Sequence, residues 1–114
     1  MKRSHSLKKN ADIEAVLSYK RAAHTAHFSV YKKPKTQAEH YRVAFSVPKK
    51  FGNAVKRNQM KRRLRVIFDQ LTIQSTDDVF VLVRPNAKDL TFEQIQNDIK
   101  VCLNKQKLIE EVFE

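Results

Sequence analysis

The stretch Ser46–Arg65, SVPKKFGNAVKRNQMKRRLR, organises the rest of this chain. It begins as an extended segment, and Pro48 marks the end of that segment because proline has no backbone N–H to donate to a sheet. Gly52, the one glycine of the chain, is expected to allow a close turn. Asn53 is a suitable N-cap for a helix that we expect to run to about Gln74.

The predicted helix has two different faces. On one face, apolar residues recur at helical spacing, and these are Met60, Leu64, Ile67, Phe68 and Leu71. The other face is cationic, and the stretch holds Lys56, Arg57, Lys61, Arg62, Arg63 and Arg65 with no acidic residue between them. Like charges at this spacing repel, and cations near a helix start oppose the helix dipole. Folding therefore does not explain the pattern, which indicates a polyanionic partner.

Charge is unevenly distributed along the 114 residues, whose formal net charge is +11. Residues 1–65 contain 18 Lys and Arg against 3 Asp and Glu, whereas residues 66–114 contain 5 against 9. The first part is thus expected to bind a nucleic acid. We expect a single domain over residues 1–114 in the cytoplasm and no membrane association, because no long apolar run or signal segment is present. The single cysteine, Cys102, excludes an internal disulfide and is expected in the core.

Local patterns predict the other elements. A helix is expected after Asn10 as N-cap, with a stripe formed by Ile13, Val16 and Leu17 that packs on a sheet. Alternating residues predict strands at 27–32 and 41–47, antiparallel to each other, and an apolar run predicts a strand at 79–83. Thr91 and Gln94 form a capping-box signature for a last helix.

These elements predict an α+β fold, a single small domain with the order α-β-β-α-β-α. The sheet is expected to be mostly antiparallel, with three or four strands and with helices that cover one of its faces. The acidic tail contains Leu108, Ile109, Val112 and Phe113, and the pattern is compatible with either a continued helix or an edge segment.

The sequence contains no recognisable set of catalytic or metal-binding residues. We find no Ser/His/Asp arrangement, zinc-ligand spacing or phosphate-binding glycine loop. His24 and His27 alone provide too few ligands for a metal, and Asp77 and Asp78 are expected to be turn residues at a strand start. We therefore predict no catalytic residues and no metal ligands, and expect the polypeptide alone to bind rather than to catalyse.

The basic stretch closely resembles the signature of the bacterial ribonuclease P protein subunit. The resemblance is carried by Lys49, Lys50, Gly52, Ala54, Val55, Arg57, Asn58, Lys61, Arg62 and Arg65. Further similarity lies in the segment 7–12, in the strand segment 28–31, in Arg42-Val43 and Ser46-Val47, and in Arg84-Pro85 followed by Leu90-Thr91. It extends over nearly the whole chain.

The resemblance implies a function and a topology. A protein of this family is the small subunit of a ribonucleoprotein endonuclease that removes the 5′ leader from precursor tRNA, and the RNA subunit with its bound Mg²⁺ carries out the hydrolysis. The implied partners are ribonuclease P RNA and precursor tRNA, with no protein partner evident and no cofactor bound tightly by the protein. The family also implies a left-handed β-α-β crossover through the basic helix, although right-handed connections are the general rule.

The resemblance also implies two groups of binding residues. Those expected to contact the catalytic RNA are Lys49, Lys50, Asn53, Lys56, Arg57, Asn58, Lys61, Arg62 and Arg65. Those expected to line a cleft for the single-stranded leader are Ile13, Leu17, Tyr31, Arg42, Ala44 and Ser46. Gln59 stands where many relatives have a third basic residue, and Ile13 and Leu17 stand where relatives often have aromatic residues, which leaves Tyr31 as the stacking ring.

Three alternatives use the same residues differently. A ribosomal or general RNA-binding protein would bind RNA through the basic helix without recognising a leader. A DNA-binding module would insert that helix into a major groove, although base-reading side chains at its start and a dimer seam are not evident. A metal-dependent nuclease would need carboxylates that are scarce in the basic half.

Overall fold

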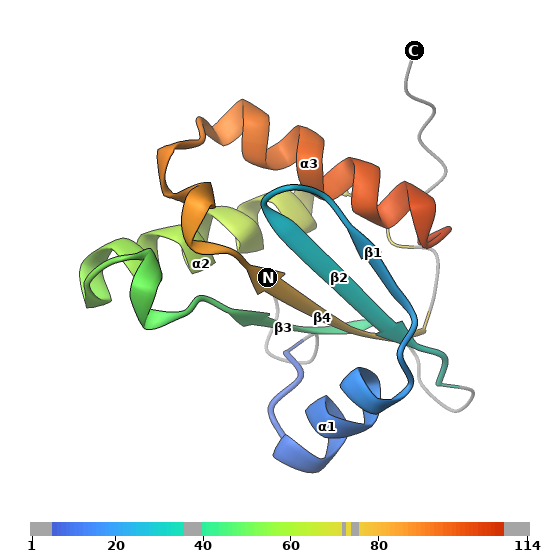
Figure 1. Ribbon diagram of the computed structural model, residues 1–114. Coiled ribbons are helices and arrows are strands. Elements are labelled where there is room, and N and C mark those ends of the chain that lie inside the picture. Colours follow the sequence, from blue (N-terminus) through green and yellow to red (C-terminus); the bar gives the residue numbers. More distant parts are fainter. Residues whose placement is uncertain (1–5, 36–39, 72, 74–75, 109–114) are drawn as a thin grey trace.

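The computed structural model describes residues 6–35, 40–71, 73 and 76–108, and Figure 1 shows their arrangement. Its regular elements, in chain order, are α1 (Asn10–Ser18), β1 (Ala22–His24), β2 (Phe28–Lys33), β3 (Arg42–Ser46), α2 (Ala54–Gln70), β4 (Asp78–Val83) and α3 (Phe92–Lys105). Short 3-10 helices at Lys49–Phe51 and Pro85–Asp89 precede α2 and α3. The α+β class and the predicted order are confirmed, with β1 as an additional strand.

The four strands form one mixed sheet in the order β1-β2-β4-β3. β1 pairs with β2, and β2 with β4, in antiparallel fashion, whereas β3 pairs with β4 in parallel. The strands β2 and β3 run in opposite directions, as predicted, but β4 lies between them. Since β3 and β4 are parallel neighbours, α2 is the crossover that connects them. The left-handed sense of this crossover stays a prediction.

Helices cover both faces of the sheet, so the expectation that they cover one face is wrong. Figure 1 shows α1 on one side of the strands and α2 and α3 on the other. Strand alternation explains the difference, because the residues of β4 that point away from α2 and α3 include Phe80 and Leu82, which are apolar. The predicted apolar stripe of α1 packs on that second face, with Val16 fully buried.

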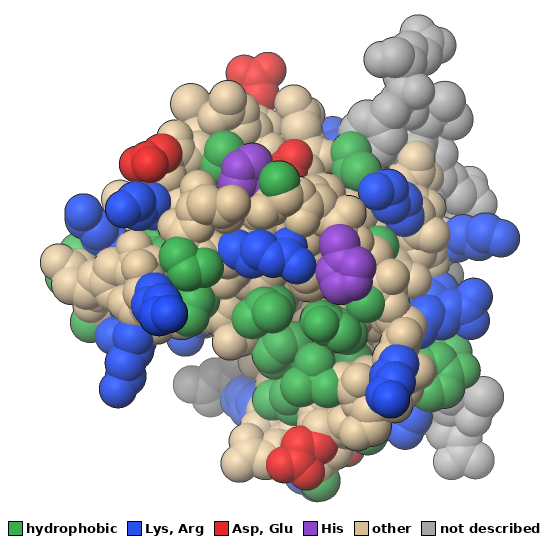
Figure 2. Space-filling view, in the orientation of Figure 1, with side chains coloured by type: hydrophobic (Ala, Val, Ile, Leu, Met, Phe, Trp, Pro, Cys, Tyr) green, Lys and Arg blue, Asp and Glu red, His purple; other side chains and the backbone are tan. Residues whose placement is uncertain are grey.

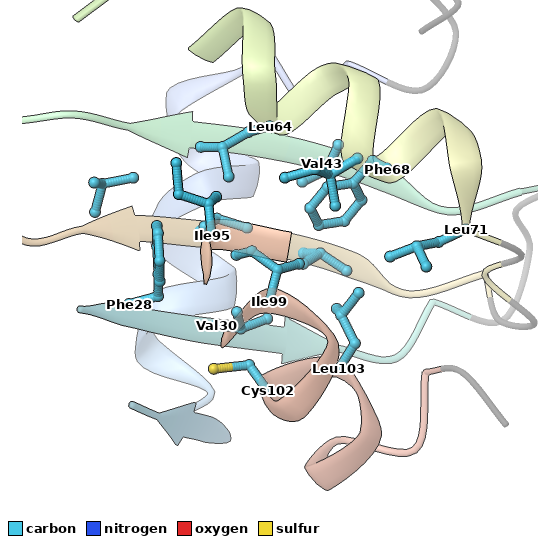
Figure 3. Packing of buried hydrophobic residues seen from close by; sticks show 14 of the residues in the cluster. Phe28, Val30, Val43, Leu64, Phe68, Leu71, Ile95, Ile99, Cys102 and Leu103 are labelled. Carbon is cyan, nitrogen blue, oxygen red and sulfur yellow. The ribbon is translucent and has the colours of Figure 1, made fainter. Parts of the chain in front are cut away.

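The core lies between the sheet and the helices α2 and α3. Figure 3 shows Leu64 and Phe68 of α2 and Ile95, Ile99 and Leu103 of α3 directed toward the strands. The strands contribute Phe28, Val30, Val43, Val79, Val81 and Val83, all buried. Cys102 belongs to the same cluster, as predicted, and is a free thiol. This core holds α2 by its apolar face and leaves its basic face outward.

Helix ends agree with part of the predicted capping. Thr91 and Gln94 form the predicted capping box at the start of α3. Asn10 is the first residue of α1 rather than its N-cap, and no side chain caps this helix. The helix α2 ends at Gln70, four residues earlier than expected, because extended backbone at Leu71 turns the chain away while the Leu71 side chain stays buried. Leu108 is buried after α3, and the rest of the predicted acidic tail lies outside the described residues.

Candidate nucleic-acid interface

The start of α2 is built as the sequence predicts. The Asn53 side-chain oxygen accepts a hydrogen bond from the backbone N–H of Lys56 at 3.0 Å and caps the helix. Gly52 itself has extended backbone that any residue can adopt. Glycine suits this position because of the space around it: a Cβ atom at Gly52 would lie 3.1 Å and 3.2 Å from side-chain carbons of Lys56. The missing Cβ therefore leaves room for the stem of Lys56, a candidate RNA-binding residue.

The cations of α2 lie on the face of the helix opposite its buried residues. Met60, Leu64, Ile67 and Phe68 are buried, as the periodicity predicts. The six cations between Lys56 and Arg65 form no ion pair with any residue in the described part of the chain. Lys56, Arg62 and Arg65 are exposed. The face is therefore an uncompensated positive surface, open to an anion.

A pocket extends this surface beyond the predicted residues. It has a volume of about 320 Å³ and lies where the start of α2 meets the two 3-10 helices. Its lining consists of Phe51, Lys56, Gln59, Met60, Arg63, Lys88 and Asp89. Lys88 was not among the predicted site residues, because it follows β4 and only the fold brings it to α2. Arg63 belongs to the cationic run but not to the family signature. In the structure its side chain lines this pocket.

The second predicted group lies on the face of the sheet that α1 covers. The strand register places Tyr31, Phe80 and Ala44 in one row, and Ser29, Leu82 and Ser46 in the next. Figure 2 shows hydrophobic side chains gathered between the strands and α1, with Lys and Arg side chains around them. The ring of Phe80 lies 6.3 Å from that of Tyr31. Phe80 is thus a second half-buried aromatic residue beside the predicted stacking ring, and only strand pairing reveals it.

The two predicted groups of residues meet at a smaller pocket of about 220 Å³. The lining contains Ile13 and Ala44 from the predicted leader cleft and Lys61 and Arg65 from the basic face, together with Ser6, Leu7, Val43 and Phe45. Leu7 is held there by a hydrogen bond from its backbone N–H to the carbonyl of Val43, at 2.9 Å. The two groups of predicted residues therefore adjoin each other on the surface. The remaining leader-cleft residue of α1, Leu17, is 37% exposed.

Arg42, predicted to face the leader, is tied to two carboxylates. Its Nε and Nη2 donate to the two carboxylate oxygens of Asp78 at 2.9 and 2.8 Å, and Nη2 lies 3.5 Å from Asp12 of α1. The hydrogen bonds to Asp78 are the main cause that raises the pKa of Arg42. Asp78 is buried in β4, so it is a structural partner rather than the turn residue that the sequence suggested. Arg42 therefore also positions α1 against the sheet.

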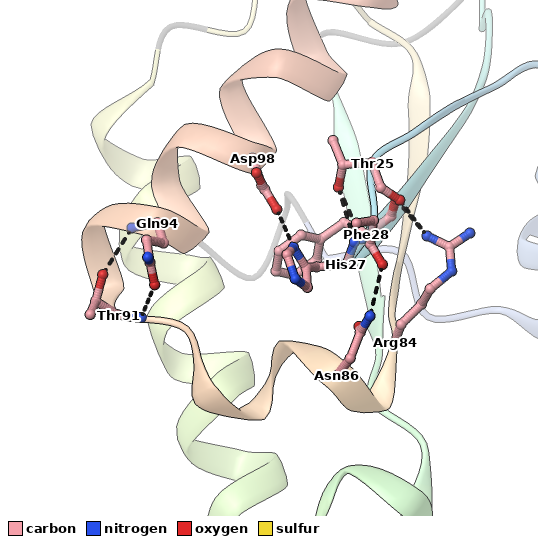
Figure 4. Close-up of polar contacts among 9 residues, drawn as sticks. Thr25, His27, Phe28, Arg84, Asn86, Thr91, Gln94 and Asp98 are labelled. Carbon is pink, nitrogen blue, oxygen red and sulfur yellow. Dashed lines mark hydrogen bonds and ion pairs between the residues drawn. The ribbon is translucent and has the colours of Figure 1, made fainter.

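His24 and His27 have different hydrogen-bond partners. Figure 4 shows His27 directed toward Asp98 of α3, at 2.8 Å, while His24 bonds Ser29 on the α1 face of the sheet. Within the described ranges, no group of three His, Cys, Asp or Glu residues is arranged to hold a metal ion. In the same part of the chain, every helix is too short or too polar to cross a membrane.

These features define a small α+β protein with a mixed four-stranded sheet and an uncompensated cationic helix. The Ribonuclease P family profile matches residues 1–107. The ribonuclease P protein component of Acholeplasma laidlawii is 38% identical over 112 residues, covering 96% of both chains, and that of Enterococcus faecalis is 36% identical, covering 96% of this chain and 95% of its own. A solved structure of the Staphylococcus aureus RNase P protein superposes with a TM-score of 0.86 at 35% identity, covering 93% of this chain and 98% of its own.

The chain therefore belongs to the ribonuclease P protein family, whose members take part in tRNA 5′ processing within a ribonucleoprotein.

Proposed function

We propose that this chain binds the RNA subunit of ribonuclease P through the basic face of α2. The observation that carries the proposal is the row of cations that lack partners in the described protein, backed by a fully apolar core face. Arginine forks and lysine ammonium groups suit RNA phosphates. The exposed Lys49 and Lys50 precede α2 on the adjoining 3-10 helix and extend this surface.

We also infer that the 5′ leader of precursor tRNA lies against the α1 face of the sheet. Half-buried rings of Tyr31 and Phe80 offer apolar surface to unpaired bases, and the pocket at Ile13 joins this surface to Lys61 and Arg65. In this proposal the RNA subunit holds the Mg²⁺ that assists hydrolysis, and the protein supplies binding and positioning. Cleavage then yields the mature 5′ end of tRNA.

The proposal is tested by the affinity of the reconstituted ribonucleoprotein for precursor and mature tRNA. Leader contacts require tighter binding of the precursor, and Tyr31→Ala should reduce that preference while binding of mature tRNA stays the same. A general RNA-binding protein would add equal affinity for both tRNAs. Equal affinities would therefore overturn the assignment of the α1 face to the leader.

A further inference from the structure

His24 lies at the edge of the surface assigned to the leader, outside the predicted site residues. It is opposite Ser29 in the pairing of β1 with β2, and its exposed side chain is on the same face as Tyr31. The His24 ring stands edge-on to the Tyr31 ring, with centroids 6.2 Å apart and planes at 88°. Because Tyr31 also contacts Phe80, aromatic rings from β1, β2 and β4 form one continuous row.

The orientation of His24 is fixed from the inside of the protein. Ser29 is fully buried, and its Oγ lies 2.7 Å from Arg84 Nη2 and 2.7 Å from His24 Nδ1. Arginine only donates hydrogen bonds, so Ser29 Oγ accepts from Arg84. Figure 4 shows Arg84 directed at Thr25, and its Nη1 donates to the carbonyl oxygens of Thr25 and Phe28 at 2.8 and 3.0 Å.

This arrangement determines which imidazole nitrogen carries the proton. The Ser29 hydroxyl must donate its own proton, and His24 Nδ1 is the one acceptor within reach among the described residues. Nδ1 therefore accepts, and the proton of the neutral ring is on Nε2. Nε2 has no hydrogen-bond partner in the described part of the chain. An oriented donor thus stands next to the Tyr31 ring, unused by the fold.

We propose that His24 is an additional RNA-contacting residue that takes a leader base next to the one at Tyr31. Ser29 lies two residues from Tyr31 along β2, a step of about 7 Å, and His24 is opposite Ser29 on β1, so His24 is displaced from Tyr31 both along the strands and across the sheet. The ring packs against the base, and Nε2–H, which points outward in the plane of the ring, donates to an acceptor on an adjoining nucleotide, as single-stranded RNA recognition commonly combines stacking with hydrogen bonds. This inference rests on the proposed leader-binding role of the α1 face.

The test uses the ribonucleoprotein reconstituted from the full chain and ribonuclease P RNA. The dissociation constants of precursor and mature tRNA are measured for wild type, His24→Ala and His24→Phe. His24→Ala should lower the preference for the precursor about fivefold or more, the effect of losing one stacked base. His24→Phe keeps the ring but not the donor, so it should retain part of the preference. A second series of precursors with successively shorter leaders should remove the His24→Ala effect at the length that no longer reaches this residue.

His27→Ala is the matched control. It removes a histidine three residues away that pairs with Asp98 on the α3 side, so it should lower the melting temperature and leave the preference for the precursor unchanged. If wild type prefers the precursor and Tyr31→Ala reduces that preference but His24→Ala does not, this inference is overturned and the proposed function stays intact. A His24→Ala effect on mature tRNA, or one independent of leader length, would also overturn it. Absence of any preference in wild type would overturn the proposed function itself.

Discussion

Arg42 shows how one side chain can set the geometry of the surface assigned to the leader. Its guanidinium joins β3 to the buried Asp78 of β4 and reaches Asp12 of α1. A bidentate ion pair of this kind fixes the relative orientation of the two side chains as well as attracting them. Arg42, which the sequence suggested only as an RNA ligand, therefore also links the sheet to α1, the helix that carries Ile13 and Leu17.

Replacement of Arg42 by alanine should lower the free energy of unfolding by about 2–3 kcal/mol, because it leaves the buried Asp78 carboxylate without its partner. Urea denaturation at neutral pH measures the change. Arg42→Lys keeps the charge but loses the fork, so its loss should be smaller. A loss below about 0.5 kcal/mol for Arg42→Ala would show that the pair behaves like an ordinary surface ion pair.

Burial raises the pKa of the Cys102 thiol above its ordinary value of 9.0. Between the ordinary and the raised pKa, the unfolded chain has lost the thiol proton while the folded chain still holds it. Stability is therefore fully present below pH 9.0 and falls as pH rises above it. Burial, followed by the charge of Asp69, raises the pKa of Tyr41 and adds the same trend at higher pH.

Cys102→Ala should remove the thiol part of this alkaline loss, so the unfolding free energy should decline less steeply just above pH 9.0 than in wild type. Urea denaturation from pH 7 to pH 10.5 measures the slope, and a lower overall stability of the variant does not affect the comparison. Identical slopes would mean that the thiol has the same pKa in both states.

At the scale of elements, α2 combines an apolar face that packs into the core with a cationic face that we propose binds RNA. Its buried residues pack against the sheet and α3, and the cations remain on the outside. Like charges on one helix side reduce its stability slightly, and the apolar contacts offset that cost. The helix can therefore be changed on its outer face without loss of the core.

Arg62→Ala should weaken binding to ribonuclease P RNA and reduce the slope of log K against log salt by about 0.7–0.9, as expected for one phosphate contact. Titrations over a series of salt concentrations measure the slope. Lys100→Ala, on α3, removes the same charge outside the α2 face and should leave the slope unchanged. An Arg62→Ala slope equal to that of wild type would remove Arg62 from the interface.

Elements with a strong hydrophobic periodicity can be predicted from the sequence. Features of the sheet that depend on pairing between distant strands cannot. The faces of α2, the alternation of Val43 and its neighbours and the Thr91 capping box are local patterns, and the structure confirms them. β1 has only Ala22, Ala23 and His24, which carry no strand signal, and it exists because β2 pairs with it. Likewise, the insertion of β4 between β2 and β3 depends on contacts that no local pattern encodes.

The same limit applies to the candidate site. The cations of α2 can be found from sequence because they are close together in the chain, and the family signature supplies their expected role. Lys88 joins Lys56 at a pocket, and Phe80 joins Tyr31, only after the chain has folded. The roles of the predicted RNA-binding and leader-binding residues stay predictions that the experiments above address.

The whole molecule separates its charge as the proposed function requires. The positive excess lies in residues 1–65, which include the cationic first part of α2 and most of the sheet face assigned to the leader, whereas residues 66–114 carry a net negative charge. RNA attracted to the first part is thus directed to the two adjoining candidate surfaces. In this view the protein increases the affinity of a catalytic RNA for its precursor and reduces the Mg²⁺ concentration that the RNA needs.

The most direct test of this view is leader cleavage by ribonuclease P RNA at a Mg²⁺ concentration too low for the RNA alone. Addition of the wild-type protein should restore cleavage at the mature 5′ end, and a variant with Arg57, Lys61 and Arg62 changed to alanine should restore much less. The protein without RNA is the control and should leave the precursor intact. If the protein does not stimulate the RNA, or cleaves at this position without it, the account of an RNA-assisting subunit is contradicted.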